Sequence, residues 1–251
     1  MSKLFHKMDN PFIEFIIEFI LFLRALYFTG TRYRCPCCGW RVRAFTTGGV
    51  SMNTRELGYC PRCNSKARHR RDWIYLRQHT NLFTEDLKLI HISPKFSLSR
   101  KLAKRKNIHY FGVDISHRRQ VCTFLDITAC SFISDAFDAL ICIHVLEEIP
   151  DDRIAMQELY RILKPGGWAF ITVPIDLERI TYEDPTITSP EHRKRAFGES
   201  AHVRIYGLDL NQRLQESGFE VKIEYAADIP EHIRVKFGLN DDENIFFCRK
   251  F

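Results

Sequence analysis

The sequence predicts an α/β protein whose body is a doubly wound, mostly parallel sheet of seven strands, preceded by a small cysteine-rich module and a leading apolar helix. Residues 137–143 form a near-continuous apolar run of strand length, which is typical of a strand buried on both faces. Residues 168–173 form a second such run, and apolar residues recur at helical spacing between the two. A right-handed β-α-β unit of this kind turns the ends of its strands toward a ligand crevice.

The helix of this unit has recognisable ends. Asp151 and Asp152 supply carboxylates for its first free N–H groups. Lys164-Pro165-Gly166-Gly167 is expected to stop the helix, because proline cannot continue it and glycine adopts the left-handed C-cap conformation.

Five further apolar runs complete the predicted sheet, at residues 87–92, 108–114, 121–126, 219–225 and 244–250. The second and third of these runs are separated only by residues 115–120, whereas a parallel crossover normally takes about a dozen residues or more. We therefore expect this crossover helix to be shortened or missing. Helices are also predicted over 65–79, capped by Ser65 with Trp73 and Leu76 facing inward, and over 208–217, closed by Gly218.

Four cysteines occur in two short pairs with 21 residues between them, Cys35-x-x-Cys38 and Cys60-x-x-Cys63. Two residues between thiolates allow a tight turn to aim both sulfurs at one ion, and Gly39 and Asn64 suit the positive φ of such turns. The pattern predicts a structural zinc site with four thiolates and a spacer hairpin around residues 48–49. Cys37 is the spare thiol, unless the register exchanges it with Cys38.

Three segments of the body are similar to a known family: Phe137-Asp138, His144-Val145-Leu146-Glu147, and residues 158–167. They resemble the class I S-adenosylmethionine (SAM)-dependent methyltransferases, and more narrowly a group of uncharacterised bacterial methyltransferases with an N-terminal zinc ribbon. The resemblance covers residues 32–250. It implies a Rossmann-like sheet whose last strand, 244–250, pairs antiparallel at the far edge, SAM as cofactor, and methyl transfer to an unidentified acceptor.

The resemblance also implies that two aspartates hold the nucleoside of SAM. Asp114 ends a predicted strand and would accept hydrogen bonds from the ribose hydroxyls, as acids do in dinucleotide folds. Asp126 would bind the adenine amino group, with Ile127 beside the ring. Both aspartates have an alternative interpretation as ordinary loop residues.

The loop at residues 93–97 would hold the methionine end of SAM. In most class I methyltransferases this loop is rich in glycine and preceded by an acid, whereas here it contains no glycine and His91 occupies the place of the acid. Ser93-Pro94-Lys95 stands where the zinc-ribbon group has Ala-Pro-Glu. Lys95 could instead meet the carboxylate of the cofactor.

Candidate catalytic and substrate residues follow the later strands. His144 would line the reaction centre, with a structural role bonded to local backbone as the alternative. Residues 174–200 are long enough for a lid or substrate loop. Tyr182 of this segment is a candidate substrate-binding residue. Three further candidates match a recurring pattern of the zinc-ribbon methyltransferase group: His202, Arg204 and Tyr206. Tyr206 could equally belong to the core.

Charge is unevenly distributed along the 251 residues, whose net charge is +6 and whose apolar content of 45% permits a sizeable core. Basic residues concentrate between Arg32 and Arg77, where Glu56 and Asp72 are the only acids, and Arg68-His69-Arg70-Arg71 forms a predicted basic patch. An anionic partner such as RNA is one interpretation, and a solvated face is the other. Nine cysteines in this pattern indicate a reducing, cytoplasmic compartment rather than a disulfide scaffold.

Residues 12–28 are strongly apolar, and Asn10-Pro11 suits a helix start. Glu14, Glu18 and Arg24 interrupt the run, so it is a poor transmembrane or signal segment. We expect a helix that packs on the body, on a second subunit or on a membrane surface.

These patterns divide the chain into a leading helix at 1–30, a zinc ribbon with a basic linker helix at 31–80, and a SAM-dependent methyltransferase domain at 81–251. The alternative function is a non-catalytic binding module, in which a degenerate methyltransferase fold persists and the basic ribbon binds RNA or an acidic partner.

Overall fold

The computed structural model describes residues 11–46, 58–94, 96–116, 121–239 and 243–251. These residues belong to two compact units, each of which combines segments that are distant in sequence. Unit 1 comprises Met1–Glu85, Lys95–Leu102 and Ala227–Asp242, and unit 2 comprises Asp86–Pro94, Ala103–Ala226 and Glu243–Phe251. Two segments that follow the predicted boundary at residue 80 therefore belong to unit 1.

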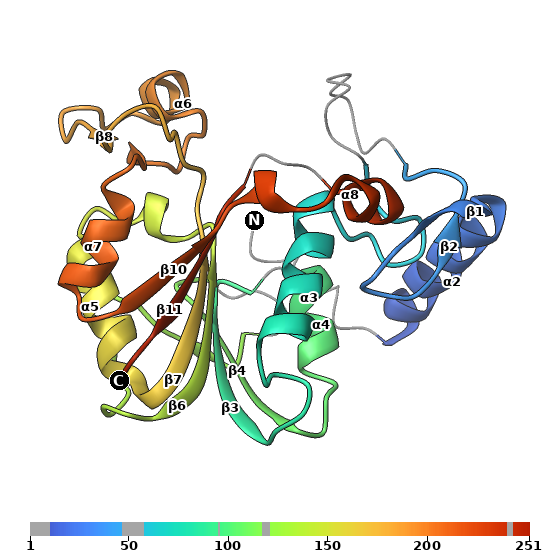
Figure 1. The fold of residues 1–251 in the computed structure, drawn as a ribbon, viewed down its shortest axis with the longest axis horizontal. Coiled ribbons are helices and arrows are strands. Elements are labelled where there is room, and N and C mark those ends of the chain that lie inside the picture. Colours follow the sequence, from blue (N-terminus) through green and yellow to red (C-terminus); the bar gives the residue numbers. More distant parts are fainter. Residues whose placement is uncertain (1–10, 47–57, 95, 117–120, 240–242) are drawn as a thin grey trace. The chain divides into compact units, whose positions relative to one another are not determined.

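Unit 2 is built on a seven-stranded sheet, as the sequence predicts (Figure 1). The strands lie in the order β10-β11-β7-β6-β3-β4-β5, and β3 to β7 run parallel. Their bounds are β3 Leu87–Ile92, β4 Ile108–Asp114, β5 Thr123–Phe124, β6 Phe137–Ile143, β7 Leu163–Thr172, β10 Glu220–Glu224 and β11 Ile245–Arg249. All seven predicted strands are present, although β5 is much shorter than expected.

The last strand lies inside the sheet rather than at its edge. β11 pairs antiparallel with β7 on one side and with β10 on the other, so β10 forms the edge. Residues 245–248 are all buried, which is typical of a strand covered on both faces, whereas no residue of β10 is fully buried. The antiparallel pairing is confirmed and the expected edge position is wrong.

Two helices cover one face of this sheet, α5 (Asp152–Ile162) and α7 (Leu210–Glu216) (Figure 1). Their apolar residues, among them Leu159 and Leu214, share a buried cluster with Ile90 of β3 and Ile171 of β7. Gly218 closes α7 with a left-handed φ of 105°, as predicted.

The predicted glycine C-cap of α5 is wrong. The helix ends at Ile162, and Leu163 already has extended backbone and pairs with Phe137 of β6. Gly166 does have a left-handed φ of 78°, but it lies within the start of β7. The chain passes directly from helix to strand because the backbone N–H groups of Asp135 and Ala136, just before β6, donate to the carbonyls of Arg161 and Ile162 that a C-cap would otherwise satisfy.

The long segment after β7 has secondary structure of its own. It contains β8 (Tyr182–Glu183), α6 (Pro190–Phe197) and β9 (Arg204–Ile205), with β8 and β9 pairing antiparallel. Short 3-10 helices, η2 (Leu146–Glu148) and η3 (Ala226–Asp228), complete the connections. In Figure 1, β8 and α6 lie beyond one end of the sheet of unit 2.

Unit 1 contains four helices and one strand pair among the described residues: α2 Pro11–Tyr27, β1 Thr29–Arg34, β2 Arg41–Val42, α3 Ala67–His79, α4 Phe96–Leu102 and α8 Glu231–Phe237. Trp73 and Leu76 of α3 are buried, as predicted. Ser65 does not cap α3, which begins at Ala67, because its hydroxyl lies among the cysteine sulfurs instead. Among the described residues, no helix is long and apolar enough to cross a membrane.

The predicted basic patch on α3 is largely wrong, because Arg70 and Arg71 are buried. Arg70 donates hydrogen bonds to the carbonyls of Gly58 at 3.1 Å and Phe237 at 2.8 Å, and its guanidinium lies 3.8 Å from the ring centre of Phe45. Burial lowers the pKa of Arg70, and the surrounding carbonyls satisfy its charge. Arg70 therefore fastens the cysteine-bearing loops to the end of α8.

Four predictions fall on residues outside the described part of the chain. These are the helix start at Asn10, the spacer hairpin at 48–49, the contact of Lys95, and most of the short crossover at 117–120. The ends of the spacer are described, and Thr46 and Tyr59 pair there as an antiparallel bridge.

Candidate functional site

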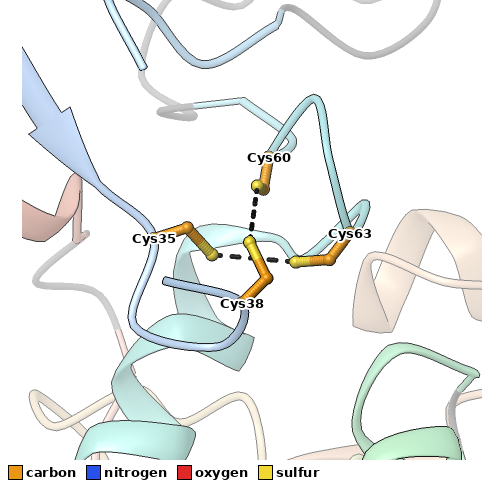
Figure 2. Close-up of side chains that lie close together, drawn as sticks. All are labelled: Cys35, Cys38, Cys60 and Cys63. Carbon is orange, nitrogen blue, oxygen red and sulfur yellow. Dashed lines mark hydrogen bonds between the residues drawn. The ribbon is translucent and has the colours of Figure 1, made fainter. Parts of the chain in front are cut away.

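The four paired cysteines converge within unit 1, with their sulfurs pointing toward one another (Figure 2). The Sγ atoms of Cys35 and Cys63 lie 3.7 Å apart, as do those of Cys38 and Cys60, and all four sulfurs lie within 4.8 Å of one another. Sulfurs at the corners of a tetrahedron about 2.3 Å from a central ion would be about 3.8 Å apart. The cluster therefore has the dimensions of a four-thiolate metal site.

The two cysteine turns have the same backbone geometry. Gly39 N donates to Cys35 O and Asn64 N donates to Cys60 O, each at 2.8 Å. Gly39 and Asn64 both have left-handed φ, at 77° and 58°, as their sequence positions predict. Cys37 lies outside the cluster, where its sulfur is 3.5 Å from the carbonyl oxygen of His69, so the structure selects Cys38 rather than Cys37.

The two predicted nucleoside-binding aspartates lie at the carboxyl ends of neighbouring parallel strands in unit 2. Asp114 is the last residue of β4 and pairs with Phe124 of β5. Leu125 N donates to Asp114 O at 3.0 Å, and Asp126 follows immediately. The sheet therefore brings Asp114 and Asp126 to one edge.

The same local turn orients both carboxylates. Asp114 Oδ1 accepts hydrogen bonds from the backbone N and Oγ of Ser116 at 2.9 and 2.8 Å. Asp126 Oδ1 accepts from the backbone N and Oγ1 of Thr128, both at 2.8 Å. Asp114 is buried and Asp126 is exposed, whereas Ile127 lies in the core.

Two non-glycine residues adopt left-handed backbone at the ends of the adjacent strands β3 and β6. Ser93 has φ 46° and His144 has φ 52°. Each conformation costs about 1 kcal/mol for a residue with a Cβ, and such strain tends to collect at functional sites. Ser93 N donates to Val113 O at 2.8 Å, so the pairing of β3 with β4 continues to the start of this turn.

His91 has a partner inside the sheet. It is 1% exposed, and its Nδ1 lies 3.0 Å from the hydroxyl of Tyr110 on β4. Alternation along β3 places His91 on the face opposite to Ile90 and Ile92.

His144 lies between two carboxylates. Its Nδ1 is 3.2 Å from Glu147 Oε1 and its Nε2 is 3.2 Å from Glu243 Oε1. His202 Nε2 is 3.9 Å from Glu147 Oε1, and Glu147 is 1% exposed. Burial alone would lower the pKa of His144, but the two carboxylates raise it to about 9. The sequence pattern did not indicate Glu243, which approaches from the segment before β11.

Arg204 and Tyr206, two of the predicted substrate residues, are buried and hydrogen-bonded to other parts of the protein. Arg204 is 4% exposed and donates to Glu183 at 2.8 Å, to Pro150 O at 2.7 Å, and to the carbonyls of Leu146 and Ile149. The hydroxyl of Tyr206 is fully buried and donates to Asp152 at 2.8 Å. The N–H groups of Arg204 are thus taken up by protein acceptors, and Tyr206 is a core residue.

The other two predicted substrate residues differ in exposure. Tyr182 is 42% exposed and packs on Phe197 of α6, with ring centres 5.6 Å apart. The side chain of His202 is 13% exposed, with Nδ1 3.3 Å from the carbonyl oxygen of Phe197.

An open pocket of about 540 Å³ lies between the start of α5 and the β8–α6–β9 segment. It is lined mainly by charged side chains and prolines, and by neither of the nucleoside-binding aspartates nor His144. Arg204 and Arg213 form part of its wall and are paired with Asp152 and Glu183. The pocket therefore lies apart from the edge that carries Asp114 and Asp126.

The model of a family described as a methyltransferase domain matches residues 97–222. Among curated proteins, a ubiquinone biosynthesis O-methyltransferase from Chromobacterium violaceum is 32% identical over 77 residues, which cover 30% of this chain and 32% of that protein. A sterol 24-C-methyltransferase from Candida albicans is 28% identical over 131 residues, covering 50% of this chain and 33% of that protein. The chain thus spans about a third of the length of these curated relatives.

Solved structures show the same fold. The [4+2]-cyclase SpnF has a TM-score of 0.52 at 16% identity, covering 83% of this chain and 89% of that chain. A SAM-dependent methyltransferase from Mesorhizobium loti has a TM-score of 0.50 at 15% identity, covering 71% of this chain and 97% of that chain. One of these two proteins is named a cyclase, so the fold by itself does not determine the reaction.

Proposed function

Because this chain belongs to the methyltransferase-domain family, we propose that it binds SAM at the carboxyl edge of β3, β4 and β5 and transfers the methyl group to an acceptor. The observation that carries the proposal is the meeting of Asp114, Asp126 and the left-handed turn at Ser93 along this one edge. Ligands of open α/β sheets bind outside the carboxyl ends of the strands.

The residues at this edge have the chemistry that the cofactor requires. Asp114 and Asp126 are acceptors that suit ribose hydroxyls and an adenine amino group, and the turns at Ser116 and Thr128 hold their carboxylates in place. The turn at Ser93 supports close backbone approach to the methionine end without a glycine. When bound, SAM supplies an electrophilic methyl group on a sulfonium.

His144 carries a positive charge in this proposal. A pKa of about 9 keeps it protonated at neutral pH, so it holds Glu147 and Glu243 rather than accepting a proton. In-line methyl transfer depends chiefly on the alignment of sulfur, methyl group and acceptor, so it does not need a dedicated base. Tyr182 and His202 stay candidates for acceptor contacts, whereas Arg204 and Tyr206 do not.

Calorimetry with S-adenosylhomocysteine, the demethylated product, tests the cofactor site on the full chain. We expect Asp114→Ala and Asp126→Ala to weaken binding more than tenfold, because each loses a charged hydrogen-bond acceptor. Asp184→Ala is a matched control, since Asp184 makes the same turn with Thr186, through bonds of 2.9 and 2.7 Å, away from the β4–β5 edge. Unchanged affinity in Asp114→Ala would refute the assignment.

The same experiment distinguishes an enzyme from the alternative binding module. No measurable heat and no thermal stabilisation with either SAM or its demethylated product would favour a methyltransferase fold without cofactor competence.

We also propose that Cys35, Cys38, Cys60 and Cys63 hold a structural zinc ion. The sulfur separations of 3.7 Å and the two matching turns support this assignment. Four protein ligands leave no open position on the metal, so the ion would stabilise unit 1 rather than take part in methyl transfer.

A further inference from the structure

Within unit 1, helix α2 turns the charged side chains of Glu18 and Arg24 inward. Glu18 forms ion pairs with Arg62, at 2.8 Å, and with Arg100. Arg24 Nε donates to Pro61 O at 2.9 Å, and Ala25 is completely buried. Glu18 and Arg24, two of the residues that interrupt the apolar sequence, therefore anchor the helix to the second cysteine turn and to α4.

The opposite side of α2 is an exposed apolar face. Its side chains, between 40% and 71% exposed, are Phe15, Ile16, Phe19, Ile20, Phe22, Leu23, Leu26 and Tyr27. At about 100° per residue these positions form one continuous arc of the helix surface. No charged residue lies on this arc among residues 15–27. Isolated exposed apolar side chains are common on proteins, but a continuous face of this kind marks an interaction surface.

Four arginines stand next to this face. Arg32, Arg34 and Arg41 are exposed on the β1–β2 pair that follows α2, and Arg43 is exposed directly after β2. The guanidinium of Arg43 lies 4.7 Å from the ring centre of Tyr27, the last residue of the helix. Residues 28–46 contain no aspartate or glutamate. An apolar surface therefore borders directly on a positively charged one.

We propose that the apolar face of α2 and these four arginines form a docking surface for an anionic lipid bilayer. An interfacial helix lies in the plane of the membrane with its apolar face at the boundary of headgroups and acyl chains. Arginines beside it meet acidic headgroups, and a tyrosine at its end suits the same depth. A membrane-surface helix normally carries its own basic residues, but here the neighbouring strand pair supplies them.

The two other kinds of partner fit the surface less well. A symmetric contact with a second copy would place the same patch on both sides, and the arginines would find no acidic residue of the patch to pair with. RNA would engage the arginines but would leave the apolar face in water.

Flotation of the full chain with vesicles tests the proposal. We expect binding to vesicles of phosphatidylcholine and phosphatidylglycerol at 7:3, weaker binding to phosphatidylcholine alone, and a steep decrease with added salt. Replacing one exposed arginine, as in Arg41→Ala, should lower the affinity for anionic vesicles about fivefold, since each such charge contributes about 1 kcal/mol near the surface.

Substitutions on the helix test the apolar face. Phe19→Glu and Leu23→Glu should each reduce binding more than tenfold, whereas Ile133→Glu, which adds the same charge at a side chain that is 79% exposed on unit 2, should not. The Phe19→Trp variant should still bind anionic vesicles, and its tryptophan emission should shift to shorter wavelength when it does. This variant keeps the test valid if Phe19→Glu fails to fold.

Three results would overturn the proposal. In the first, the chain sediments as a dimer, Phe19→Glu dissociates this dimer, and the chain does not bind vesicles. A second copy of the chain would then cover the apolar face. In the second, the chain is a monomer that does not bind vesicles, and Phe19→Glu lowers its melting temperature. The apolar face would then pack against another part of the chain. The third is salt-sensitive RNA binding without vesicle binding.

Discussion

The charge state of His144 yields a quantitative prediction. Its imidazole lies between Glu147 and Glu243, at 3.2 Å from an oxygen of each, and its pKa is raised from 6.5 to about 9. A shift of this size corresponds to about 3 kcal/mol of stabilisation for the charged form in the folded state. Since the folded pKa is the higher one, this stability is complete below pH 6.5 and is lost as the pH rises through 9.

The informative perturbation is Glu243→Gln. The two carboxylates share the shift, so removing the charge of one should lower the pKa of His144 by about one unit, which is about 1.4 kcal/mol. Glu148→Gln is the matched control, because Glu148 is exposed in the same short helix as Glu147 and forms no ion pair with His144.

Carbon-13 NMR of labelled histidine measures the pKa directly, and the His144→Gln variant assigns the signal. Urea denaturation at pH 6 and pH 9.5 measures the accompanying stability. The native chain should lose about 3 kcal/mol more than His144→Gln over this range. A His144 pKa near 6.5, or parallel pH dependences in the two proteins, would refute this account of the cluster.

Three further predictions concern the metal site, the strained turn and the buried charge network. Cys38→Ser should abolish zinc binding and unfold unit 1, whereas Cys37→Ser should retain one zinc per chain by elemental analysis; equal loss in both would contradict the ligand assignment. Ser93→Gly should raise the free energy of unfolding by up to about 1 kcal/mol in urea titrations, since glycine adopts a φ of 46° without strain. Arg204→Met should lower that free energy by about 1–3 kcal/mol, because it leaves the carbonyls of Leu146 and Ile149 without their buried donor. Arg153→Met, at an exposed ion pair, should change it by less than about 1 kcal/mol, and similar losses in both arginine variants would show that the buried network is not special.

Local chemistry explains why much of the fold could be predicted. The buried run of β6 and the helical spacing of α5 reflect periodicities that each segment carries by itself. The geometry of each cysteine turn is equally local, because a Cys-x-x-Cys turn with Gly39 or Asn64 sets its own backbone conformation. The carboxyl-edge position of Asp114 and Asp126 follows from strand ends that the sequence already marks.

Charged residues were the least predictable, because the sequence records a charge but not whether water surrounds it. Arg70 looked like part of a basic surface and is instead buried against the carbonyl of Phe237, 167 residues away. Arg204 looked like a substrate contact and is instead occupied by Glu183 and the carbonyls around Ile149. Each outcome depends on acceptors that only the folded chain brings into reach.

The sequence by itself determined where the apolar runs of the strands lie, where the two paired-cysteine turns lie, and the apolar character of α2. Only the tertiary structure decided which charges are buried, that Glu243 completes the surroundings of His144, and that α2 turns Glu18 and Arg24 inward. The physical reason is the range of the interactions: hydrophobic periodicity and metal-ligand spacing act within a few residues. The burial of a charge requires partners from distant segments, which meet only in the folded protein.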